Sequence, residues 1–116
     1  CDTGIAAVEA AAFARSQGVD FIVTDHHDLP AVLPDAYAIV NPKIVTQDGI
    51  LRHASLRSLP GVGVAYQLAQ ALYRRAGRAK AAAGLLDLVA LGIVADLAEL
   101  TGDVRPLLQH GLAALR

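Results

Sequence analysis

Asp20-Phe21-Ile22-Val23-Thr24-Asp25-His26-His27 is the stretch of sequence that indicates the fold. Its first half is short, apolar and partly β-branched, which is typical of a buried strand. The strand runs directly into a carboxylate and two imidazoles, and in open α/β sheets ligands bind at the carboxyl ends of the strands. Carboxylate and imidazole are also ligands of divalent first-row metals. The stretch therefore predicts an α/β fold with a metal or ligand site at residues 25–27.

Helical and strand-like patterns alternate along the rest of the chain. The spacing of apolar residues predicts helices over residues 4–17, 61–75, 80–95 and 105–115, and strands over residues 21–24 and 37–40. We expect Thr3 to cap the first helix and Gly18 to end it, with Phe13 on its buried stripe. The helix over residues 80–95 is so apolar that we expect it to be mostly buried. This order of elements indicates a short parallel sheet flanked by helices.

Composition limits the possible classes of protein. The chain has 116 residues, of which 54% are hydrophobic and 18% charged, and this apolar surplus is typical of a segment of a larger protein. The first residue is Cys1 and the chain has no Met, so we expect an excised segment. A net charge of −1 gives no basic footprint for nucleic acid. No signal peptide and no apolar stretch of membrane-spanning length is visible, so we expect a cytoplasmic protein without a membrane partner.

Three places in the sequence could carry chemistry. Asp2 precedes the first predicted helix, where an aspartate is most often simply a cap. Asp25, His26 and His27 follow the first strand, where the imidazoles can splay toward a metal and a substrate or can merely fill structure. Asp96 ends an almost wholly apolar helix, at the terminus that disfavours negative charge. That position favours a ligand role for Asp96 over the alternative of a solvated carboxylate.

Four stretches of the chain carry a joint pattern. They are Asp2-Thr3-Gly4-Ile5; residues 18–27 with Leu33-Pro34 and Val40-Asn41-Pro42; residues 61–68; and residues 87–96 with Gly111-Leu112. Together they resemble the second to fourth motifs of the DHH phosphoesterase superfamily, and within it the RecJ-type exonucleases specific for single strands. The resemblance covers nearly the whole chain and keeps the family's order of motifs.

The resemblance implies a two-metal phosphodiesterase, with two Mn²⁺ or Mg²⁺ ions, that degrades single-stranded DNA in DNA repair and recombination. By motif matching, Asp2 would bridge the two metals, and His26 and Asp96 would bind one of them. Asp25 would orient the site, and His27 would face the substrate phosphate. The fold implied is part of a DHH phosphoesterase domain, a parallel sheet with covering helices, over residues 1–116.

The chain lacks two parts of the family pattern. The family's first motif, Asp-x-Asp, and its C-terminal domain are not in the sequence. We therefore expect the 116-residue chain alone to be inactive and to need the missing N-terminal strands and C-terminal domain of the same protein. Arg105 could meet a phosphate or could be a solvated arginine at a helix start. Other DHH enzymes remain open, such as an oligoribonuclease, a cyclic-dinucleotide phosphodiesterase or a pyrophosphatase, and so does a non-catalytic DHH scaffold.

The connection over residues 43–60 has no clear period. Loops of this length are commonly functional or mobile. Arg52, His53 and Arg57 could form a basic face that guides a phosphate backbone. The alternative is a surface crossover held by a few aliphatic side chains.

Overall fold

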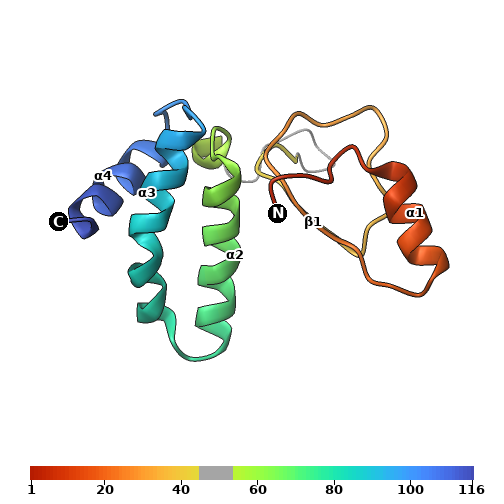
Figure 1. Ribbon diagram of the computed structural model, residues 1–116, viewed down its shortest axis with the longest axis horizontal. Helices are drawn as coiled ribbons and strands as arrows, with labels where there is room; N and C mark the ends of the chain where they lie inside the picture. Colours follow the sequence, from red (N-terminus) through yellow and green to blue (C-terminus); the bar gives the residue numbers. More distant parts are fainter. Residues whose placement is uncertain (45–53) are drawn as a thin grey trace.

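Figure 1 shows the chain as two parts, a helical bundle at its C-terminal end and a smaller lobe of strands and one helix at its N-terminal end. This computed structural model describes residues 1–44 and 54–116. The N-terminal lobe contains α1 (Val8–Ser16), β1 (Ile22–Thr24) and β2 (Ala38–Val40). The remaining elements are η1 (Ala54–Leu56), α2 (Gly61–Arg75), η2 (Ala79–Leu85), α3 (Leu86–Ala95) and α4 (Val104–Ala114).

The sheet is parallel, as the sequence predicts. β1 and β2 pair with Ile22 opposite Ala38 and Thr24 opposite Val40. The segment before α1 adds an isolated antiparallel bridge between Thr3 and Thr24. Within it, the backbone N–H of Asp2 donates a hydrogen bond to the carbonyl oxygen of Thr24 at 2.7 Å. The bridge therefore places residue 2 beside the carboxyl end of β1.

The first helix differs from its prediction. It begins at Val8 instead of residue 4, and the position before it is Ala7, which makes no side-chain capping bond. The prediction of Thr3 as a cap is wrong, because the backbone at Thr3 pairs with β1 instead. Phe13, predicted on the buried stripe, is 68% exposed. Of the residues of α1, Ala11 is the one that is buried.

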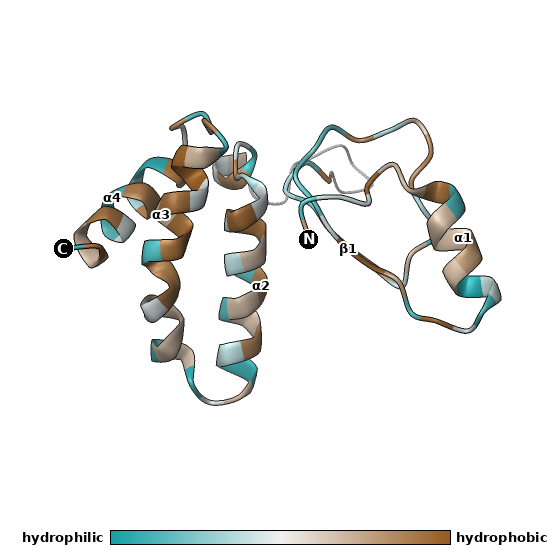
Figure 2. Ribbon diagram, in the orientation of Figure 1, coloured by the Kyte–Doolittle hydropathy of each residue, from teal (hydrophilic) through white to brown (hydrophobic). Residues whose placement is uncertain are grey.

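The helix predicted over residues 80–95 is two elements. A 3₁₀ segment, η2, precedes α3, and Gly84 lies near their junction, where a glycine lowers helix propensity. The prediction that this segment is mostly buried is wrong for one face of α3. Leu88, Leu91 and Val94 are each more than half exposed, and Figure 2 shows apolar residues over much of that helix.

The main core lies within the helical bundle. Its buried members are Leu59, Val64, Tyr66, Ala82, Val89, Ile93 and Val104. Glycines let the helices approach closely. A Cβ at Gly92 would lie 2.6 Å from the Cβ of Val62 on α2, and one at Gly111 of α4 would collide with the carbonyl oxygen of Leu86 on α3. At these two positions, α3 therefore lies close against α2 and α4.

Two further predictions concern the connection over residues 43–60 and the absence of a membrane-spanning stretch. Of the connection over residues 43–60, residues 45–53 lie outside the described part, and Arg52 and His53 with them. Its end forms the short η1 turn before α2. Among the described helices, none is both long and apolar enough to cross a bilayer.

Candidate metal centre

Three potential metal ligands converge where β1 ends. Asp2 is brought there by the bridge to Thr24, and His26 and His27 follow β1 directly in sequence. His26 Nε2 lies 3.1 Å from Asp2 Oδ1. One ligand atom from each of Asp2, His26 and His27 can be chosen so that all three lie within 4.8 Å of one another. A carboxylate and two imidazoles at this spacing are able to share one divalent cation.

Asp2 has an unusual backbone conformation. Its φ of 64° lies in the left-handed region, which costs a non-glycine residue energy and is commonly found at functional sites. Its carboxylate packs against Gly61, the first residue of α2, so closely that a Cβ on Gly61 would collide with it. The strand lobe and the helical bundle therefore meet at this carboxylate.

Asp25 organises the loop that carries the two histidines. The residue is only 1% exposed. Its Oδ2 accepts a hydrogen bond from the Ile5 N–H at 2.9 Å, and its Oδ1 accepts one from the His26 N–H at 2.7 Å and another from the His27 N–H at 3.2 Å. Burial acts to raise the pKa of Asp25, but these bonds, led by the one from Ile5, lower that pKa to about 2. The group is therefore a buried carboxylate with both oxygens occupied.

The side chain of His27 is oriented by the same carboxylate. Its Nδ1 lies 2.6 Å from Asp25 Oδ1, and this hydrogen bond raises the pKa of His27. A ring that donates from Nδ1 to a carboxylate leaves Nε2 for a metal or a substrate. The imidazole is 61% exposed, so Nε2 is accessible from solvent. His26 is less exposed, and the two ring centroids are 4.5 Å apart.

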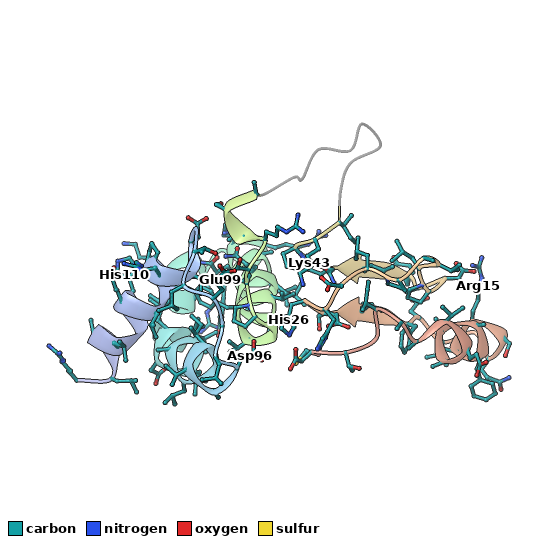
Figure 3. All side chains as sticks on the ribbon, turned by 90° about the horizontal axis from the view of Figure 1, so that it is seen from above. Arg15, His26, Lys43, Asp96, Glu99 and His110 are labelled. Carbon is teal, nitrogen blue, oxygen red and sulfur yellow. The ribbon has the colours of Figure 1, made fainter. Side chains whose placement is uncertain are left out.

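Asp96 lies at a cleft beside the three ligands. It is the residue that ends α3, and it lines an open cleft of about 320 Å³ together with His26, Lys43 and Glu99. Figure 3 shows these four residues gathered between the helical bundle and the strand lobe, with Arg15 and His110 at opposite ends of the molecule. Among the described residues, the group with metal-binding spacing contains Asp2, His26 and His27 but not Asp96.

The sequence analysis gave no role to Lys43, Asp28 or Asn41. Its prediction that Arg105 could meet a phosphate stays a prediction. Arg105 is exposed near the start of α4 and does not line this cleft. Lys43 and Asp28 do line the cleft, and Asn41 connects the loops around it. The signal for Lys43 was present, because it comes directly after the Asn41-Pro42 pair that ends the second strand. The rule that places sites at the carboxyl ends of strands applies to it as well.

The chain is similar to known proteins in sequence and in fold. Residues 1–93 match the family described as "DHH family, N-terminal domain". The single-stranded-DNA-specific exonuclease RecJ of Bacillus subtilis is 44% identical over 99% of this chain and 13% of its own length. RecJ of Haemophilus influenzae is 40% identical over 99% of the chain and 20% of its own length. The chain thus spans only a minor part of these relatives.

A solved structure shows the same fold. The crystal structure of exonuclease RecJ bound to manganese superimposes with a TM-score of 0.79 at 34% identity, over 97% of this chain and 27% of the other. The matched family covers residues 1–93 and so includes β1, β2 and the three converging ligands. From its sequence and its fold alike, this chain belongs to the DHH family.

Proposed function

We propose that this chain is part of a metal-dependent phosphodiesterase that removes nucleotides from single-stranded DNA, in DNA repair and recombination. The observation that carries the proposal is the convergence of Asp2, His26 and His27 at the end of β1. The relatives, named as single-stranded-DNA-specific exonucleases, support the choice of substrate. A DNA substrate also supports a cytoplasmic location, since the two relatives are bacterial proteins and bacterial DNA lies in the cytoplasm.

The donor set fits a manganese or magnesium ion. Hard carboxylate oxygens combined with imidazole suit Mn²⁺, and the relative with the solved structure is described as bound to manganese. We assign Asp2 as the ligand shared by two ions, and His26 and Asp96 as ligands of one of them. When bound, two such ions would supply an activated water and would neutralise charge on the phosphoryl group.

The remaining residues position the histidines or bind the substrate. Asp25 holds the backbone of both histidines and fixes the His27 ring through Nδ1. Because that bond holds Nδ1, the Nε2 atom of the ring is left to face a phosphate oxygen. We assign His27 to the substrate phosphate, and Arg105 to a more distant part of the substrate.

The proposal requires more than residues 1–116. The chain spans 13% and 20% of the two RecJ relatives. We propose that it forms the part of a DHH domain that contains the second to fourth motifs. Other segments of the same polypeptide would supply the remaining metal ligands and clamp the DNA. The 116-residue chain alone is then expected to be inactive.

The test compares substrates with the full-length protein in Mn²⁺. Labelled single-stranded DNA, duplex DNA, short RNA oligonucleotides and pyrophosphate are incubated separately, and products are quantified. We expect single-stranded DNA to be degraded fastest. Preferential hydrolysis of short RNA or pyrophosphate would replace this proposal with another DHH activity, and no hydrolysis of any substrate would favour a scaffold.

Two histidine variants separate the assigned roles. His26→Ala should abolish both Mn²⁺ binding by calorimetry and DNA hydrolysis, because it deletes a ligand. His27→Ala should lower turnover more than metal affinity. His110→Ala is the matched control, since His110 is exposed on α4 far from the cleft. Equal loss of Mn²⁺ affinity in the first two variants would make His27 a ligand, as its place in the three-residue group allows.

A further inference from the structure

A buried amide connects the loops that follow the two strands. Asn41, 9% exposed, donates from Nδ2 to the carbonyl oxygen of His27 at 3.1 Å. Its Oδ1 accepts a hydrogen bond from the backbone N–H of Lys43 at 2.8 Å. The backbone of Lys43 is therefore tied, through one side chain, to the backbone of a residue of the metal centre.

The ammonium group of Lys43 lies at the cleft beside that centre. It pairs with Asp28 at 2.9 Å, and its own side chain is only 25% exposed while that of Asp28 is 93% exposed. Arg57, which precedes α2, lines the same cleft. Asp28 lines it as well, so the three charged groups share one cleft. Two cations thus converge beside His26.

A contribution to stability does not explain why Lys43 and Asp28 are paired. An ion pair with so exposed a partner contributes little to stability. It does hold the ammonium group at the cleft, and a phosphate oxygen can take the place of the Asp28 carboxylate there. Phosphate contacts from lysine and arginine are also what positions a nucleic-acid strand on a protein.

We propose that Lys43 and Arg57 bind a phosphodiester of the DNA strand next to the one that is cut, with Asn41 holding Lys43 in register with the metal centre. This inference rests on the proposed function and adds a backbone-binding position to it. The substrate must then have at least two consecutive phosphodiesters to use the position. A substrate with a single phosphodiester reaches the metal centre without it.

The test uses the full-length protein with Mn²⁺ and two substrates, a single-stranded oligonucleotide and the p-nitrophenyl ester of thymidine 5′-monophosphate. The variants are Lys43→Gln, Arg57→Gln and the double variant. Arg15→Gln is the matched control, because Arg15 is likewise paired with an aspartate, Asp35, but lies at the far end of the strand lobe. Lys43→Arg keeps the charge and tests rescue.

We expect each single variant to raise KM for the oligonucleotide about tenfold, the loss of one charge-assisted contact, with kcat little changed. Turnover of the single ester should stay within about twofold of wild type, as should all parameters of Arg15→Gln. In metal-free binding, each lost contact should reduce the log–log salt slope by about 0.7. Lys43→Arg should restore most of the oligonucleotide KM.

The outcomes distinguish this site from the function on which it rests. A wild-type protein that hydrolyses neither substrate overturns both. A wild-type protein that is active, with a double variant that keeps its oligonucleotide KM and salt slope, overturns the phosphate position alone. Equal losses on the ester and the oligonucleotide also overturn it, because they would place Lys43 and Arg57 at the phosphate that is cut.

Discussion

At the scale of single residues, the charge of Asp25 is the feature on which the site depends most. Its carboxylate is buried and accepts hydrogen bonds from Ile5, His26 and His27. Asp25→Asn keeps the size of the side chain but replaces one acceptor oxygen with an NH2 group, which would face N–H donors. We expect the free energy of unfolding to fall by about 2–3 kcal/mol in urea denaturation. Asp20→Asn, at an exposed position, should change it by less than about 0.5 kcal/mol, and equal effects would contradict this account.

The same residue predicts a dependence of stability on pH. The pKa of Asp25 is about 2 in the folded chain against an ordinary value of 3.8. A lowered folded pKa means that the carboxylate contributes stability above about pH 4 and loses it as the pH falls toward 2. This contribution is about 2 kcal/mol. Urea denaturation of wild type and Asp25→Asn between pH 6 and pH 2.5 should therefore converge at low pH. A constant difference between the two would be the contrary result.

At the scale of elements, the close approach of α3 and α4 is the most sensitive contact. A Cβ at Gly111 would meet the carbonyl oxygen of Leu86 and the Cβ of Ala90, and backbone does not move aside cheaply. Gly111→Ala should destabilise by about 1–3 kcal/mol despite its better helix propensity. Gly84→Ala is the control, because nothing lies within 4 Å of a Cβ there. Thermal unfolding of the two variants should separate them. A Gly111→Ala variant as stable as wild type would mean that the helices can move apart.

The residue pattern within one segment predicted those helices and strands whose bounds depend on that segment alone. Residues 61–75 have an apolar stripe and form α2 with the predicted bounds, and the strand at 37–40 differs by one residue. The start of α1 was predicted wrongly because the Thr3–Thr24 bridge is a pairing between residues 21 positions apart. Nothing near Thr3 in the sequence indicates that its backbone is used elsewhere.

For the candidate site too, the sequence showed what lies within one segment but not the contacts between distant segments. The donors at Asp25-His26-His27 follow a strand and are visible in one short stretch of sequence. The contact between Asp2 and Gly61 joins residues 59 positions apart, and the tie from His27 through Asn41 to Lys43 joins two loops. These contacts depend on how the two lobes and the two strands meet. A pattern of residue types along one segment does not contain that information.

At the scale of the whole molecule, a metal ion would join segments that are far apart in sequence. An ion held by Asp2 and His26 binds the folded chain but not the unfolded one. Mn²⁺ at about 100 times its Kd should therefore add about 2.7 kcal/mol to the free energy of unfolding. Calorimetric melting of the full-length protein should show a rise in Tm with Mn²⁺ that His26→Ala loses and His110→Ala keeps. An unchanged Tm in wild type would contradict the proposed ligand set.

The packing of Gly61 against Asp2 also makes the geometry of the metal centre sensitive to the tilt of α2. α2 has 15 residues, so it is about 22 Å long. Pivoted at its far end, a tilt of about 3° moves its first residue by about 1 Å, whereas metal–ligand distances tolerate only about 0.2 Å. Substitutions near Tyr73 that shift the far end of α2 would thus lower Mn²⁺ affinity by tilting the helix, without changing a metal ligand.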